Sequence, residues 1–167
     1  PVFFGNTRCL RCGAELGFVP ETLSLQALPI AGADGQLLQR CANHPTIGCN
    51  WLVPPREAAS LGGLCRACRL NRTLPDLWLE ENRRAWAAIE AAKRRLVMQL
   101  LALGLPVHSR LGEDPERGLM FDFLRPWDGQ PVRTGHAGGL ITLNVEEADD
   151  ARREAMRKQL GEPYRTL

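Results

Sequence analysis

The chain has 167 residues, of which 44% are hydrophobic and 24% charged, and its formal net charge is +2. This is the composition of an ordinary globular protein, and it excludes a wholly disordered or low-complexity chain. The longest apolar stretch, residues 96–107, is too short to cross a bilayer, so we expect no membrane span and no membrane partner. No secretion signal is recognisable, and we therefore expect a cytoplasmic protein.

Cysteine divides the chain into two parts. All six cysteines precede residue 75, and none follows it: Cys9, Cys12, Cys41, Cys49, Cys65 and Cys68. This shift in composition predicts two domains, a zinc-ribbon region over residues 1–75 and a second domain over residues 76–167.

Two C-x-x-C turns lie in the first part, one ending at Cys12 and one at Cys68. This spacing lets two thiolates bind one tetrahedral metal ion from a tight turn. A disulfide framework is disfavoured because no secretion signal is present, and a thioredoxin-like site because Gly, Pro and Asn surround both pairs. We predict that one structural Zn²⁺ is bound by Cys41, Cys49, Cys65 and Cys68.

The remaining pair, Cys9 and Cys12, has no second pair in the sequence. His44 is a candidate ligand, but Asn43 and Pro45 favour a surface histidine in a loop. We expect that Cys9 and Cys12 form half of a second zinc site, which a further cysteine pair ahead of Pro1 would complete.

Arginines flank the predicted ligands. They can be interpreted either as counter-charges for the metal site or as contacts for nucleic acid. Four thiolates on one Zn²⁺ leave a net charge of −2, which neighbouring guanidinium groups can offset. The basic excess of residues 1–75 is also small, so nucleic acid is not an expected partner. The residues concerned are Arg8, Arg11, Arg40, Arg66 and Arg69.

The second part has helical and strand periodicity. A helix is predicted over residues 83–103, capped by Asn82 and ended by Gly104, with its charged residues, such as Glu90 and Arg94, on the faces away from the apolar stripe. Strands are predicted over residues 118–124, with Phe121 and Phe123 on the face opposite Asp122, and over residues 139–145. Between them, residues 126–138 are rich in turn formers, and a second helix is predicted over residues 146–160.

No catalytic motif is recognisable in these residues. The sequence lacks H-E-x-x-H, G-x-S-x-G and a phosphate-binding loop, and His44, His108 and His136 stand apart from one another. From the residues alone, the chain is a zinc-ribbon module followed by an α/β segment of unassigned activity.

The sequence nevertheless resembles the bacterial zinc-binding metallopeptidases that carry an N-terminal zinc ribbon. The strings that carry the resemblance cover nearly the whole chain: residues 3–13, 49–51, 65–73, 91–96, 121–124, 134–136, 139–144, 147–150 and 161–167. The resemblance implies an α+β fold, with rubredoxin-like zinc ribbons followed by the first part of a zincin-like domain. It also implies an H-E-x-x-H helix beyond Leu167, so that the catalytic residues would be absent from this chain.

By analogy with zincins, a strand ahead of the active-site helix pairs with an extended substrate. The resemblance thus implies a peptide or protein substrate and a substrate-side strand comprising Ile141, Thr142, Leu143 and Asn144. We expect the chain alone to be inactive. The alternative hypothesis is a binding module whose zinc ribbon contacts nucleic acid or a protein partner, and nothing in the sequence indicates an oligomeric state.

Overall fold

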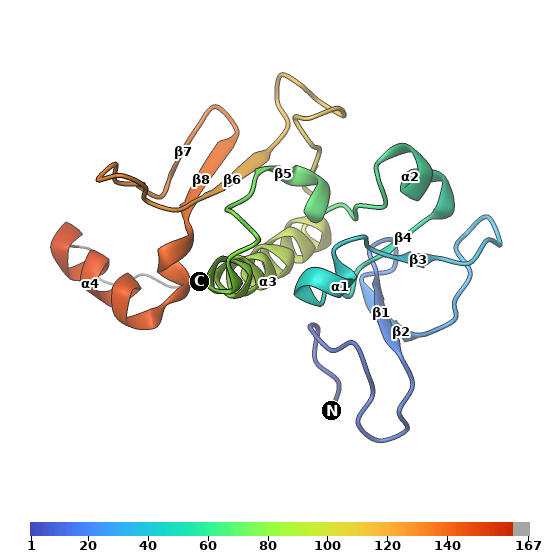
Figure 1. Cartoon of the computed structure of the whole chain (residues 1–167). Helices are drawn as coiled ribbons and strands as arrows, with labels where there is room; N and C mark the ends of the chain where they lie inside the picture. Colours follow the sequence, from blue (N-terminus) through green and yellow to red (C-terminus); the bar gives the residue numbers. More distant parts are fainter. Residues whose placement is uncertain (162–167) are drawn as a thin grey trace. The chain divides into compact units, whose positions relative to one another are not determined.

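The computed structural model describes residues 1–161 and has the expected α+β architecture (Figure 1). It divides into two compact units: Pro1–Arg69 with Lys93–Val107, and Leu70–Ala92 with His108–Leu167. Helix α3, Glu80–Ala102, contributes to both. Of the string over residues 161–167, only Gly161 lies within the described residues. The boundary at residue 75, placed from composition, stays a prediction.

The first unit contains two small antiparallel sheets, in which β1 pairs with β2 and β3 with β4. Their strands and the two short helices are β1 (Leu16–Val19), β2 (Ser24–Ala27), β3 (Gln39–Arg40), α1 (His44–Ile47), β4 (Leu52–Val53) and α2 (Pro55–Ser60). Two-stranded sheets are at best marginally stable in water. This unit therefore depends on its core and on any metal that joins its loops.

Aromatic rings form the core of the first unit. Trp51 is fully buried, and its ring centroid lies 4.7 Å from that of Phe18. Phe4 packs edge-on against Phe18, with the centroids 4.9 Å apart. The backbone N–H of Cys41 donates to the carbonyl of Trp51 at 3.0 Å, so this core fixes the start of a cysteine-bearing loop.

The second unit contains a four-stranded sheet in the order β5-β6-β8-β7. Its strands are β5 (Asn71–Thr73), β6 (Met120–Leu124), β7 (Gly135–Ala137) and β8 (Leu140–Asn144). Strand β6 runs parallel to both neighbours, whereas β7 is antiparallel to β8. The predicted strands over residues 118–124 and 139–145 are both present but slightly shorter.

Strand β6 is buried on both faces, as is common for strands in parallel pairing. Phe121, Asp122 and Phe123 are all buried, so the face that carries Asp122 is covered as well as the face that carries the two phenylalanines. The reason is Arg72 on β5, whose guanidinium makes two hydrogen bonds to the Asp122 carboxylate. Those bonds hold the pKa of Asp122 below its usual value.

Helix α3 begins three residues earlier than predicted, at Glu80. Asn82 is therefore inside the helix, where its amide donates to the carbonyl of Asp76 at 2.9 Å and does not cap the helix. Trp86 is fully buried and packs edge-on against Phe123. Gly104 follows the helix in the left-handed conformation, as expected for a residue that ends it.

The charged residues of α3 are not all on its solvent-facing side. Glu90 and Arg94, which helical periodicity places on the faces away from the apolar stripe, are both buried. Glu90 accepts a hydrogen bond from the Asn71 amide of β5 at 3.5 Å, so the sheet supplies a partner that helical periodicity could not reveal.

The predicted helix over residues 146–160 is two elements, the 3₁₀-helix η2 (Val145–Ala148) and α4 (Asp150–Leu160). Asp149 separates them because its carboxylate caps α4 by accepting from the Arg152 backbone N–H at 2.9 Å. Arg157 and Lys158 lie in the last turn, as expected from the helix dipole. Among the described residues, no helix is long and apolar enough to cross a membrane.

Candidate functional site

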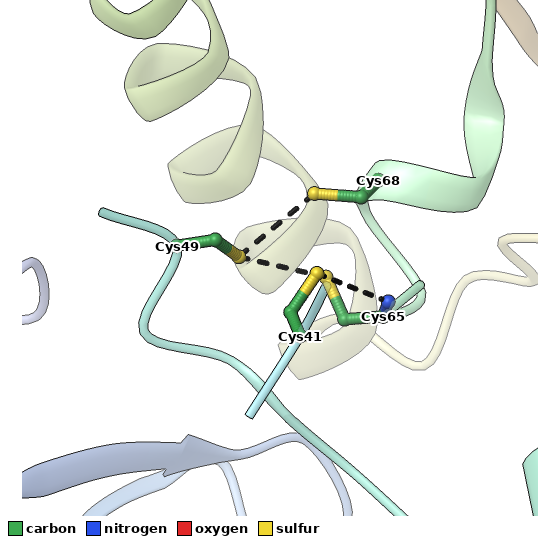
Figure 2. A group of neighbouring side chains, drawn as sticks. All are labelled: Cys41, Cys49, Cys65 and Cys68. Atoms are coloured by element: carbon green, nitrogen blue, oxygen red, sulfur yellow. Dashed lines mark hydrogen bonds between the residues drawn. The ribbon is translucent and has the colours of Figure 1, made fainter. Parts of the chain in front are cut away.

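The structure brings four of the six cysteines together. Cys41 directly follows β3, Cys49 follows α1, Cys65 lies after α2, and Cys68 opens the 3₁₀-helix η1 (Cys68–Leu70). Each is at most 1% exposed, and their Sγ atoms all lie within 4.8 Å of one another. Figure 2 shows the four side chains pointing toward a common centre.

The sulfur spacing fits a tetrahedral zinc ion. Cys49 Sγ lies 3.8 Å from the sulfurs of both Cys65 and Cys68. A tetrahedron with Zn–S bonds of about 2.3 Å has sulfurs about 3.8 Å apart. The Cys65 backbone N–H also points at Cys41 Sγ, at 3.4 Å, as is usual when the sulfur is a thiolate. Zn²⁺ is thus the cofactor that this cluster fits.

The electrostatics of the cluster also favour a bound cation. Burial raises the pKa of the Cys65 thiol, whereas a hydrogen bond from Cys49 lowers the pKa of Cys41. In the absence of metal, the buried sulfurs therefore cannot all be ionised together. A divalent metal allows all four to be thiolates at once, because its charge offsets theirs.

The arginines beside the cluster are engaged by acidic side chains. Guanidinium groups of Arg40 and Arg69 bind Glu15 and Glu57, at 3.0 and 2.9 Å. Arg66, between two cysteines of the cluster, lies 3.6 Å from Glu21. These ion pairs reduce the positive charge that this face offers to a polyanion.

His44 has a structural role that sequence reasoning missed. It lies at the start of α1 and not in a loop, and its Nδ1 is 3.0 Å from the carbonyl oxygen of Cys49. This contact holds the turn that presents Cys49. The signal in the sequence was Pro45, which favours the first turn of a helix.

Cys9 and Cys12 do not join the cluster. Cys12 is exposed and Cys9 half-buried, and no third potential ligand gathers with them among residues 1–161. Their loop nevertheless has the geometry of a metal-binding turn: backbone N–H groups of Cys12 and Arg11 hydrogen-bond to the Cys9 sulfur and lower its pKa. Gly13 has the positive φ, +75°, that ends the turn. The second zinc site stays a prediction.

The proposed substrate-side residues Ile141, Thr142, Leu143 and Asn144 all lie on β8. Substrate contact by these residues stays a prediction, but backbone pairing with a peptide is restricted by the sheet. Strand β6 pairs with β8 along its whole length, and β7 pairs with it from Leu140 to Thr142. The outer edge of the sheet on this side is therefore β7.

Strand β7 lies within the segment predicted to be turn-rich, and its three residues are exposed. Gly138 and Gly139 have φ angles of +53° and +84° and form the hairpin turn to β8. A Gly-Gly pair between two short segments is a hairpin signal, and this signal was available in the sequence. The exposed His136 lies opposite Ile141 in this hairpin.

Both ends of β7 are anchored. At the turn, Arg110 donates to the carbonyl oxygens of Gly138 and Pro115. At the start, the Thr134 hydroxyl donates to the buried Glu147 carboxylate and accepts from the Asn144 backbone N–H at 3.0 Å. The edge strand is thus held in a fixed position.

Comparison with known proteins assigns each of the two halves of the sequence to a family. A zinc-ribbon domain family matches residues 1–79, and the family described as "Putative zinc-binding metallo-peptidase" matches residues 82–167. Uncharacterized proteins of Mycobacterium bovis and Mycobacterium tuberculosis are 42% identical over 164 residues, which is 98% of this chain and 46% of theirs. The chain thus spans about half the length of these relatives, and no solved structure matches it.

These matches confirm the family indicated by the sequence strings. One of them covers more than half of the chain, and the other covers the part that contains the four-cysteine cluster. The protein therefore belongs to this zinc-binding metallopeptidase family and carries a zinc-ribbon domain as its N-terminal part.

Proposed function

We propose that this chain is the zinc-ribbon and substrate-side portion of a zinc-dependent peptidase, and that hydrolysis depends on residues outside these 167. The observation that carries the proposal is the closed four-cysteine cluster. A site with four cysteine ligands has no open position for a water molecule, so its role is structural.

The proposal separates the structural metal from the chemistry. Cys41, Cys49, Cys65 and Cys68 would hold a zinc ion that joins the loops of the small sheets. Hydrolysis needs a second metal with an open position and a base that takes a proton from bound water. The sequence has no H-E-x-x-H to supply them, and the longer relatives have room for such a motif in the half that this chain does not span.

The substrate in this proposal is a peptide or protein bound in extended form. The exposed edge strand β7 has the backbone groups to extend the sheet by one strand, with β8 directly behind it. Its anchors at Thr134 and Arg110 would pre-organise this edge and so reduce the entropy lost on binding.

The nucleic-acid alternative has less support. The chain carries a formal net charge of only +2, and three arginines beside the cysteine cluster face carboxylates. A binding stripe for a polyanion would instead have clustered, unpaired cations.

The test is a parallel assay of this chain and the longer Mycobacterium tuberculosis relative, both loaded with zinc. We expect the relative to cleave a denatured protein substrate, with loss of activity when a chelator is added. This chain should cleave nothing. Chelator-sensitive hydrolysis by the 167-residue chain, persisting through further purification, would overturn the proposed division of roles.

A further inference from the structure

A pocket lies at the end of the sheet where β7 begins. Its volume is about 570 Å³, which is within the range of small-ligand sites. Its lining includes Pro126 and residues 129–132, together with Ala155 and Met156 of α4. Asn144, the last residue of β8, also lines this pocket, which we call the α4 pocket.

Three of the four polar side chains that line the α4 pocket, Asn144, Glu146 and Arg152, are engaged within the protein, and the fourth is the Gln130 amide. The Asn144 amide donates to the carbonyl of Val132 at 3.2 Å, and its oxygen accepts from the Glu146 backbone N–H at 3.0 Å. The Glu146 carboxylate forms an ion pair with Arg152, so the two charged lining residues neutralise each other. At Asn144, Glu146 and Arg152, a polar or charged ligand group would have to break one of these interactions, whereas an apolar group would not.

Apart from Gln130, the rest of the lining is apolar and adaptable. Pro126, Pro131 and Val132 face a methionine, whose flexible thioether side chain adjusts to ligands of different shape. Trp127, which follows the lining residue Pro126 in the sequence, is 83% exposed.

The pocket is also placed to act together with the edge strand. Val132 precedes β7 by three residues, and Thr142, two residues before Asn144, is the register partner of Gly135. An extended chain advances about 3.3 Å per residue. A peptide of about six residues paired along β7 would therefore reach from His136 to the pocket.

We propose that the α4 pocket binds an apolar side chain, such as leucine or methionine, of an extended peptide that pairs with β7. This inference rests on the proposed peptide-binding function and names the residue class that the site selects. In this arrangement the backbone of the edge strand supplies affinity, and the pocket supplies specificity for one side chain.

The test uses the whole chain and fluorescently labelled peptides of about six residues, capped at both ends, that carry Leu, Ser or Asp at one terminal position. Binding is measured by fluorescence anisotropy, which requires no hydrolysis. Burial of one leucine side chain should make the Leu peptide bind at least about tenfold more tightly than the Ser and Asp peptides.

A matched pair of variants locates the effect. Ala155→Trp fills the pocket from an exposed position on α4, where folding tolerates a larger side chain. Ala151→Trp makes the same change one turn earlier, at an exposed position that does not line the pocket. We expect Ala155→Trp to abolish the preference for Leu and Ala151→Trp to preserve it.

Equal affinity for the three peptides, no binding of the Leu peptide, or a Leu preference that survives Ala155→Trp would each overturn the inference. These outcomes are independent of the proposed peptidase activity. If the longer relative cleaves nothing while this chain keeps its Leu preference, the proposed hydrolytic function fails and the pocket assignment stands. If the relative cleaves peptides while this chain shows no preference for the Leu peptide, the pocket assignment fails and the proposed hydrolytic function stands.

Discussion

Replacing Thr134 by valine tests whether the edge strand is fixed by its anchor. Valine has the shape of threonine but no hydroxyl, so the packing is preserved and two hydrogen bonds are lost. One is the bond that the hydroxyl donates to the Glu147 carboxylate, which is 6% exposed. The other is the 3.0 Å bond that the hydroxyl accepts from the Asn144 backbone N–H.

The expected cost follows from the burial of these partners. A hydrogen bond to a charged group contributes about 1.5–3 kcal/mol, and a neutral one about 1 kcal/mol. Because Asn144 and Glu147 are both shielded from water, solvent replaces the lost bonds poorly. We expect Thr134→Val to lower the free energy of unfolding of the second unit by roughly 2–4 kcal/mol.

Urea unfolding measures that loss, and hydrogen exchange of the β7 amides shows where it acts. The matched control is Thr142→Val on the neighbouring strand β8, because the Thr142 hydroxyl makes no hydrogen bond in the described part of the chain. The control should change stability by less than about 0.5 kcal/mol. Equal effects of the two substitutions, or unchanged exchange in β7 of Thr134→Val, would refute the anchoring role.

Three further predictions concern the metal, the acid response and the core. Cys49→Ser should abolish zinc-dependent thermal stability, since metal binding is coupled to folding, whereas Cys12→Ser should leave the melting temperature unchanged. Hydrogen bonds from Arg72 lower the pKa of Asp122, so its stabilising contribution is present above about pH 4 and is lost as the pH falls through the lowered pKa. The free energy of unfolding of Asp122→Asn, measured with urea as a function of pH, should therefore decline less steeply below pH 4 than that of the unsubstituted protein. An equal slope in the two proteins would contradict this. Phe123→Ala should cost about 3–5 kcal/mol by urea unfolding, far more than Leu124→Ala on the same strand.

The sequence predicted those features that depend on local patterns. Cysteine spacing indicated the four ligands that the structure gathers, and helical periodicity located α3 to within three residues at its start. Gly104 marked the end of α3, because a helix end of this kind depends on the backbone conformation of one residue.

Features that depend on distant partners were not predictable in the same way. The burial of Asp122 requires Arg72, which lies fifty residues earlier in the sequence. Likewise, β7 is a strand because β8 pairs with it. Its own three residues include a glycine and no branched apolar side chain, so the local sequence does not predict a strand. The placement of substrate contacts on β8 came from resemblance, and pairing of this strand on both sides moves the free backbone edge to β7.

The most direct test of the central claim is the zinc content of the purified chain, measured by native mass spectrometry. The structure predicts one tightly bound zinc ion, retained in the Cys9→Ser/Cys12→Ser double variant and lost in Cys65→Ser. A folded chain that contains no zinc, or one that keeps its zinc after loss of Cys65, would contradict the assignment of the four-cysteine cluster as the structural metal centre.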